Sequence, residues 1–511
     1  MPATVLHTRD GVLDKADQAQ LDQLAKRLNG AKVLVHLHGG LVDNDKGEEI
    51  AERLSGPAPA GWGQPADVEQ VYVVWRTGAL ETVRTNWRDL FDNDRIYRTL
   101  LKKLLSFAAS KMGVPGGPVG RTAFHARALT PTEINDRLDA RPAGDPFADV
   151  NIDLELQTPA GRGPVVQPET DGAIALQFMA LLQQDLEFSL AADDIAAALT
   201  FDKALGRSLA PRGDRSRGEA ALARLNEEAR TGLASATPTA ASGRVAFAGL
   251  SVTEFLIKRA ARTAIRVIGR LRHRRDHGLY ATIVEELTRE FYGDLVGAAI
   301  WGMIKKDAGD HFSPGGLGHA LVASLVSSRP AKLFVTGHSA GSIWAAHMLK
   351  AMASWSDTPK LRMALLAPAV RIDLFEEAIA AGGGLVEALR VFAMSDALER
   401  ADAVLGPELG FIYPSSLLYL VSGAFEELGG DGFSDAPLLG MQRFQTIEPA
   451  WLTDPGQIAS VSRAMAFLTT PNNRIVLSPA SGGRGFSCQA KSHGDFDRDR
   501  DTLASVTTFL S

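Results

Sequence analysis

The 511-residue sequence predicts an α/β fold, in which a mostly parallel sheet is flanked by helices. The first observation is a set of short apolar, β-branched runs with the length of buried strands, at residues 31–37, 71–75, 331–336, 361–367, 388–394 and 474–477. The second is a set of helical segments between or beside them, at residues 12–29, 44–55, 317–328, 342–355 and 501–510. Such alternation is typical of a parallel sheet covered on both faces.

A long interruption divides this pattern. Helical periodicity within it covers residues 80–110, 173–205 and 251–306, whereas residues 111–172 and 207–247 are expected to be loops, the second of them mobile or loosely packed. We therefore expect three parts: a first part of the core, a large and mainly helical cap inserted before the strand at 331–336, and a second part of the core. Their predicted bounds are residues 1–79, 80–314 and 315–511.

Composition excludes several classes of protein. The net charge is −6, which gives no electrostatic argument for nucleic-acid binding. Cys488 is the only cysteine, so neither an intramolecular disulfide nor a cysteine-rich zinc site can form. No signal-peptide pattern opens the sequence and no apolar run reaches 18 residues, which leads us to expect a cytoplasmic protein.

Residues 337–341 read Gly-His-Ser-Ala-Gly, a G-x-S-x-G motif between a predicted strand and a predicted helix. This context places the hydroxyl of Ser339 on a sharp turn, where glycines on either side let the two arms approach closely. The following helix directs the positive end of its dipole toward a developing oxyanion. The motif therefore predicts Ser339 as a nucleophile.

A second glycine-rich turn follows the first buried strand, at His38-Gly39-Gly40. Backbone N–H groups in such a loop, together with the N–H of the residue after the nucleophile, can stabilise an oxyanion. We predict Gly39, Gly40 and Ala340 as the oxyanion hole and expect His38 to shape the loop.

The general base is expected downstream of Ser339, where two histidines remain, His347 and His493. His347 falls within the predicted helix after the nucleophile, whereas His493 lies in a loop before the last helix and is the predicted base. Asp396, at the end of a strand, is the predicted acid, with three open alternatives at Asp373, Glu399 and Asp402.

Alternating aspartates at Asp495, Asp497, Asp499 and Asp501 suggest a calcium loop. The glycine that an EF-hand requires is missing, and a capped helix start explains the pattern better. We predict neither a metal site nor a cofactor.

With these motifs in place, the chain resembles the α/β-hydrolase superfamily, and its HGG loop is similar to that of bacterial serine esterases and lipases. The resemblance covers about residues 31–78 and 315–511. It implies a Ser339–His493–Asp396 triad that acts through an acyl-enzyme. The chain departs from the family in its large insertion and in the few residues before its first clear strand, so the sheet is expected to be short at that edge.

The expected function is hydrolysis of carboxylic esters, with a small-molecule or lipid-like ester as substrate. Alternatives are an interfacial lipase or phospholipase, a serine peptidase or amidase, and a non-enzymatic scaffold. A basic amphipathic helix around Arg259–Arg274 is expected to be either a lid helix with a solvated, salt-bridged face or a site of contact with anionic lipid at a membrane or with an acidic partner. The sequence sets neither the oligomeric state nor the acyl length.

Overall fold

The structure of the chain is a computed structural model. It describes residues 3–40, 42–65, 67–75, 80–112, 129–151, 169–202, 207–208, 213–236, 248–273, 275, 277–427, 429, 432, 435–446 and 452–511.

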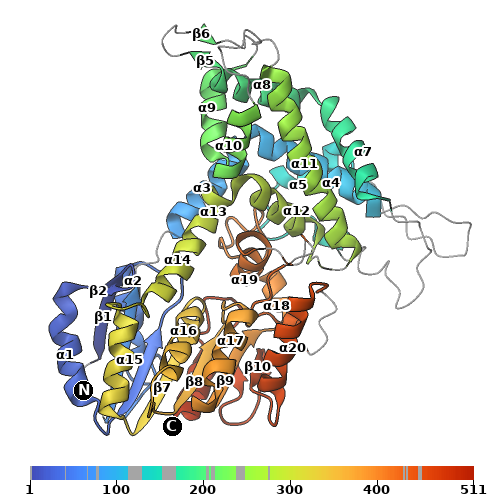
Figure 1. Cartoon of the computed structure of the whole chain (residues 1–511). Coiled ribbons are helices and arrows are strands. Elements are labelled where there is room, and N and C mark those ends of the chain that lie inside the picture. Colours follow the sequence, from blue (N-terminus) through green and yellow to red (C-terminus); the bar gives the residue numbers. More distant parts are fainter. Residues whose placement is uncertain are drawn as a thin grey trace, which may run out of the picture.

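An eight-stranded sheet in the order β10-β9-β8-β7-β3-β4-β1-β2 forms the centre of the α/β core (Figure 1). All neighbouring strands are parallel except β1 and β2. The strands are β1 Thr4–Arg9, β2 Val12–Leu13, β3 Lys32–Leu37, β4 Val68–Trp75, β7 Lys332–His338, β8 Leu361–Leu366, β9 Val386–Met394 and β10 Ile475–Ser478. The predicted fold class, a mostly parallel sheet flanked by helices, is confirmed at this level.

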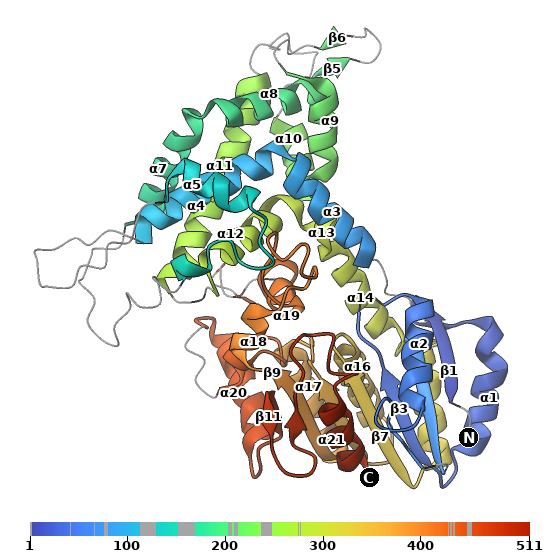
Figure 2. The same cartoon turned by 180° about the vertical axis from the view of Figure 1, so that it is seen from behind.

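Helices cover both faces of the sheet, as comparison of Figures 1 and 2 shows. One face carries α1 Gln18–Arg27, α15 Leu317–Ser328, α16 Gly341–Ala353, α17 Ile372–Gly382 and α20 Pro455–Thr469. The opposite face carries α2 Asn44–Ser55 and α21 Arg500–Leu510. Burial on both faces explains why the central strands are continuous apolar runs rather than alternating ones: all eight residues of β4 are buried.

The sheet is not short at its amino-terminal edge, which corrects the expectation from sequence. Strand β1 pairs with β4, and a tight turn at Asp10-Gly11, with φ of +52° and +75°, leads into β2. Asp-Gly is a strong hairpin signal because both central residues of such a turn need positive φ. Strand β1 alternates between buried and less buried positions, so it forms no continuous apolar run in the sequence.

Helices α3 to α13 form a separate helical body beyond one end of the strands, and α14 leads from it back to the core (Figures 1 and 2). Their bounds are α3 Leu80–Asn93, α4 Arg95–Met112, α5 Pro131–Asp139, α7 Asp171–Gln183, α8 Leu186–Leu199, α9 Arg215–Arg224, α10 Glu227–Ala236, α11 Ala248–Arg272, α12 Leu279–Leu287, α13 Gly293–Val296 and α14 Ala298–Asp310. A short hairpin, β5 Phe201–Asp202 with β6 Arg207–Ser208, lies within this series.

Two loop predictions in this region are wrong where the structure describes it. Residues 207–247 contain α9 and α10, and residues 111–172 contain α5. Each of these helices buries only a few apolar residues, among them Ala229 and Leu233 of α10 and Ile134 and Leu138 of α5. Such sparse apolar spacing gives a weak periodic signal, although Thr130 before Pro131 is a recognisable helix start. The remaining residues of both predicted loops lie outside the described residues.

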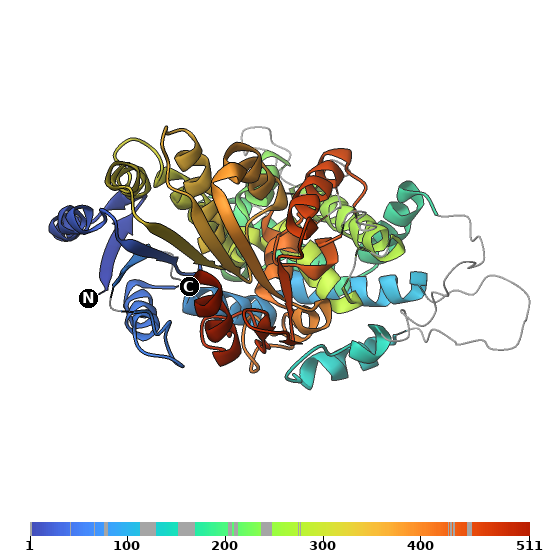
Figure 3. The same ribbon diagram turned by 90° about the horizontal axis from the view of Figure 1, so that it is seen from below.

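A second segment, residues 395–446, lies between these ends of the strands and the helical body (Figures 1 and 2). It contains α18 Asp396–Ala401, α19 Leu417–Leu420 and the single turns Val421–Phe425 and Gln442–Phe444. The segment is tied to α12, because the Tyr280 hydroxyl donates to the carbonyl of Phe411 at 2.8 Å and the Tyr413 hydroxyl donates to Glu285 at 2.5 Å. Seen from below the sheet, the core and helical body overlap along the view direction (Figure 3), as expected if the helices lie over one end of the strands.

The basic helix predicted around Arg259–Arg274 is α11, and its arginines form ion pairs with acidic residues of α12 and the turn that follows. Arg270 is fully buried and contacts Glu285 at 2.8 Å, Glu286 at 3.0 Å and Asp435 at 3.2 Å. Arg259 and Arg266 pair with Glu290, and Arg262, which is half exposed, shares the same carboxylate. Arg274 lies outside the described residues. This is the salt-bridged alternative, with most of the charge turned inward rather than solvated.

Among the described residues, no helix is long and apolar enough to cross a membrane.

Candidate active site

Ser339 occupies a strained turn between β7 and α16. Its φ is +51°, a left-handed conformation that costs free energy for a residue with a side chain. Hydrogen bonds hold it there: the Ser339 N–H donates to the carbonyl of Leu366 at 2.9 Å, and its own carbonyl accepts from the Ala369 N–H at 3.1 Å and from the Ser342 hydroxyl at 2.5 Å. The Ser339 Oγ is buried without a hydrogen-bond partner, so it is free to react.

The two glycines of the motif are required by close backbone contacts. A Cβ on Gly337 would lie 2.8 Å from the carbonyl oxygen of Gly341, and a Cβ on Gly341 would lie 2.3 Å from that of Leu37. Both distances are far below van der Waals contact. The two arms of the turn therefore approach each other closely at these glycines, as predicted.

We expect Gly341→Ala to lower the thermal midpoint of unfolding, because its Cβ must displace the end of β3 at an overpacking cost of about 1–3 kcal/mol. Gly302→Ala is the matched control, since Gly302 lies within α14 and a Cβ there meets nothing within 4 Å. Alanine at a helix interior should hold or raise stability. Equal thermal midpoints for the two variants would contradict the close-contact explanation.

The HGG loop lies directly against the turn, and a Cβ on Gly39 would be 3.2 Å from the Cβ of Ser339. His38 fixes this loop as expected: its Nε2 accepts from the Trp75 N–H at 3.2 Å, so its Nδ1 carries the proton and donates to the carbonyl of Gly39 at 2.7 Å. Since C=O and N–H of a trans peptide point in opposite directions, the N–H of Gly40 is directed away from His38.

The backbone N–H groups of Gly39, Gly40 and Ala340 donate to no other group in the described part of the chain. Ala340 is the residue immediately before α16, so its N–H lies at the positive end of that helix dipole. All three predicted oxyanion donors therefore have free N–H groups within the same small region around Ser339.

His493 shares a pocket with Ser339 and is held through its main chain. Its N–H donates to Asp402 Oδ2 at 2.9 Å, and its carbonyl accepts from His338 Nε2 at 3.0 Å. The rings of His338 and His493 stack with centroids 5.5 Å apart. Both ring nitrogens of His493 are buried without a hydrogen-bond partner. Burial and the neighbouring His338 lower the pKa of His493 to about 3, so its imidazole is neutral and available as a base.

Asp396 is not brought to this pocket. Its carboxylate accepts from the Tyr419 hydroxyl at 2.5 Å, and its backbone N–H donates to Gln442 at 2.7 Å. Asp402, one of the alternatives left open by the sequence, lines the pocket together with Ser339 and His493. Of the carboxylates that follow β9, Asp402 is therefore the one beside His493, but it contacts the main chain and not the imidazole, whose nitrogens have no partner. Asp396, six residues earlier, points toward Tyr419 of α19 instead.

The other acidic and histidine candidates have structural partners. Asp373 pairs with Arg371, and Glu399 is buried against the Ser416 hydroxyl. Asp499 caps α21 by accepting from the Thr502 N–H, and Asp495 accepts from two backbone N–H groups. His347 lies within α16 beside Phe312. Among the described residues, no group of three or more His, Cys, Asp or Glu side chains could hold a metal ion.

The pocket has a volume of about 370 Å³ and opens to solvent. Glycines of the HGG loop form one wall, and the loop Asp402–Gly406 and residues 492–494 form others. Charged side chains stand around it, namely Lys46, Arg84, Asp402, Asp497 and Arg498. A buried serine hydroxyl, a neutral imidazole and free backbone N–H groups thus line a space large enough for a small molecule.

The lowered pKa of His493 predicts an unusual pH dependence. Neutral imidazole is the competent base, and a folded-state pKa near 3 means that protonation removes it only at strongly acidic pH. We expect kcat/KM to stay level from pH 7 to about pH 5, where an imidazole with the ordinary pKa of about 6.5 would already be mostly protonated. Stopped-flow pH jumps would measure this before unfolding interferes. A half-maximal kcat/KM near pH 6.5 would contradict a buried, unpaired His493.

Comparisons with protein-family models, with curated proteins and with solved structures found no match to this chain.

Proposed function

We propose that this chain is a serine hydrolase of the α/β-hydrolase type that cleaves carboxylic esters. One observation carries the proposal. The Ser339 hydroxyl, on a turn with positive φ, and the ring of His493 line the same pocket, and neither has a hydrogen-bond partner among the described residues. Backbone strain of this kind is concentrated at functional sites, and a nucleophile needs a hydroxyl that lines the substrate pocket without being held by a structural hydrogen bond.

In the proposed reaction, Ser339 Oγ attacks the carbonyl carbon of the ester while His493 takes its proton. The oxyanion forms among the N–H groups of Gly39, Gly40 and Ala340. The carbon–oxygen bond to the alcohol then breaks, and His493 returns the proton to the departing oxygen. Water, deprotonated by His493, attacks the resulting acyl-enzyme and releases the acid with Ser339 restored.

Asp402 is the proposed acid in this triad. Its carboxylate already fixes the main chain of His493. The proposed reaction requires the imidazole to turn so that Nδ1 donates to the same carboxylate. In the free protein, catalytic hydrogen bonds are often long and shorten when substrate binds. Burial raises the pKa of Asp402, and a positively charged imidazole formed during the reaction would favour its ionised form.

Among the alternative functions, that of an interfacial lipase is less well supported by the structure. It depended on a basic helix facing a membrane, and Arg259 and Arg270 are buried in ion pairs. An amidase or peptidase would use the same groups as an esterase, so substrate comparison must separate them.

Hydrolysis of p-nitrophenyl esters, compared with that of matched p-nitroanilides, tests the proposal. We expect ester hydrolysis that a fluorophosphonate inhibitor abolishes, with the anilides turned over much more slowly. Hydrolysis of the anilides at comparable rates would indicate an amidase. Absence of both activities, together with no reaction with fluorophosphonate, would overturn the proposal and favour a non-enzymatic scaffold.

A further inference from the structure

A second cavity adjoins the pocket of Ser339, and among the described residues every side chain that lines it is apolar. The lining comes from the helical body, from α14 and from segment 395–446: Val83, Gly297, Trp301, Ile304, Val404, Leu405, Leu417, Leu420, Val421 and Phe425, together with Gly40. Gly40, Val404 and Leu417 line both spaces, so the apolar cavity lies against the reactive pocket at the oxyanion loop, where an opening between the two would lie.

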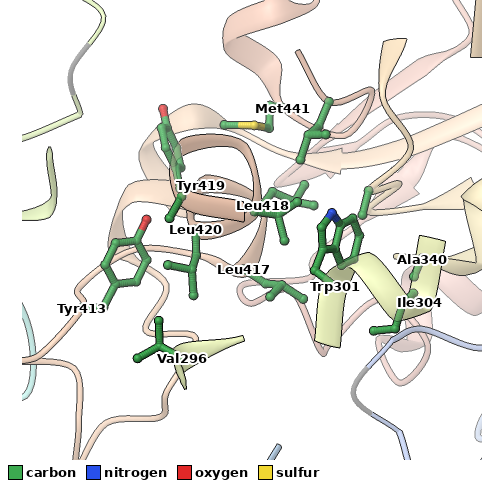
Figure 4. Packing of buried hydrophobic residues seen from close by; sticks show 14 of the residues in the cluster. Val296, Trp301, Ile304, Ala340, Tyr413, Leu417, Leu418, Tyr419, Leu420 and Met441 are labelled. Atoms are coloured by element: carbon green, nitrogen blue, oxygen red, sulfur yellow. The ribbon is translucent and has the colours of Figure 1, made fainter. Parts of the chain in front are cut away.

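The position of Ile304 shows which part of a substrate would enter. A Cβ on Gly40 would lie 3.0 Å from Ile304 Cδ1 and 3.4 Å from the Cβ of Ala340. The cavity therefore begins beside two of the proposed oxyanion donors, and Figure 4 shows Ile304 next to Ala340, with Trp301 and Leu417 toward α19. A carbonyl oxygen bound by those donors places one substituent of the carbonyl carbon at this opening.

The walls of the cavity are held by polar contacts on their outer side. Trp301 Nε1 donates to Glu426 at 2.6 Å, and the same buried carboxylate pairs with Lys305 at 2.8 Å and with Arg371 at 3.4 Å. The indole ring thus presents only carbon to the cavity and cannot turn away easily. At the far side, the ring of Phe425 lies against Gly297, where a Cβ would be 3.0 Å from Phe425 Cζ.

The cavity is small, with a volume of about 20 Å³. That is space for about one water molecule, or one methyl group, so an acyl chain longer than a few carbons would have to displace the walls. The reactive pocket, at about 370 Å³ with charged side chains around it, accommodates a much larger and more polar group. The two sides of the ester therefore meet environments of very different size and polarity.

From this asymmetry we infer that the apolar cavity is the acyl site, and that the substrates are esters of short-chain acids, with two to four carbons, and a larger, polar alcohol. The inference rests on the proposed esterase function and defines its substrate class. Longer acyl chains would have to displace Leu417 or Phe425 from packed positions.

A series of p-nitrophenyl esters from acetate to decanoate tests this inference. We expect kcat/KM to be highest at two to four acyl carbons and to fall at least about tenfold by eight, because even a single methylene that does not fit costs roughly 10- to 200-fold. A preference for eight or more carbons in an active, fluorophosphonate-reactive enzyme would overturn the acyl assignment but leave the proposed function standing. No hydrolysis and no labelling would overturn both.

Leu420→Ala and Leu418→Ala form a matched pair for locating the site. Both leucines lie in α19 and are buried, but only Leu420 lines the cavity. We expect Leu420→Ala to raise the ratio of hexanoate to acetate hydrolysis about tenfold or more, and Leu418→Ala to leave it unchanged. Equal changes in both variants would contradict the assignment. Phe425→Leu, a milder enlargement of the same cavity, gives the same readout if Leu420→Ala does not fold.

Discussion

Ser339→Ala should abolish ester hydrolysis, with a loss on the order of 10⁶ in kcat, because removal of the nucleophile of a triad enzyme leaves only the oxyanion donors. Ser339 Oγ makes no hydrogen bond, so the substitution removes no stabilising contact. Release of strain is not expected either, since alanine at φ +51° has the same Cβ. The rate measurement should therefore show a pure loss of chemistry at an unchanged thermal midpoint.

Ser342→Ala is a useful companion to that variant. Ser342 Oγ donates to the carbonyl of Ser339 and accepts from the Val370 N–H at 3.0 Å, so its loss loosens the turn without removing the nucleophile. We expect a lower thermal midpoint and a partial loss of kcat. If Ser339→Ala kept near-normal activity, another group would have to be the nucleophile.

Asp402→Asn should lower kcat by roughly 10⁴, the scale expected when the orienting carboxylate of a triad becomes an amide. The amide cannot stabilise the imidazolium that forms on His493, although its oxygen can still accept the His493 N–H. Asp396→Asn is the matched control, because its carboxylate accepts from the Tyr419 hydroxyl and does not line the pocket. We expect that variant to stay within about tenfold of the unmodified enzyme.

Steady-state kinetics on one short-chain ester, with both variants at equal concentration, gives the comparison. If Asp396→Asn lost activity while Asp402→Asn kept it, Asp396 would be the acid, as first predicted from sequence, and the assignment of Asp402 would be wrong. The pocket geometry would then have to change on substrate binding.

The central sheet could be predicted from sequence because its strands are buried on both faces. Continuous apolar runs such as residues 331–336 and 361–367 match β7 and β8 closely, and the helix predicted at 317–328 matches α15. Strand β1 was missed because it alternates in burial at the edge. Helices α17 and α20 were missed as well, and each buries only four residues along its length.

At the site, the features that could be predicted are those formed by residues close together in the sequence. Ser339, the flanking glycines and the HGG loop form a pattern within a few residues, and the structure brings them together with His493. The acid could not be chosen from sequence, because Asp396, Glu399 and Asp402 all follow the same strand. Which of them reaches His493 depends on the direction of α18, and tertiary packing fixes that direction.

The contacts of the additional segments around the site could not be predicted from the sequence either. Segment 395–446 reads as an ordinary connection, yet it supplies Val404, Leu417 and Leu420 to the apolar cavity. Likewise, the arginines of α11 look like a solvent-exposed stripe until the acidic partners on α12 and at Asp435 are placed beside them. Contacts between segments so far apart leave no local pattern.

Mass spectrometry after fluorophosphonate labelling tests the central claim most directly. Intact mass should show one adduct per chain, and peptide mapping should place it on Ser339. Labelling should disappear in Ser339→Ala and slow strongly in His493→Ala, because the reagent reacts with a serine activated by its base. An unlabelled chain, or an adduct on another residue that persists in Ser339→Ala, would contradict the assignment of Ser339 as the nucleophile.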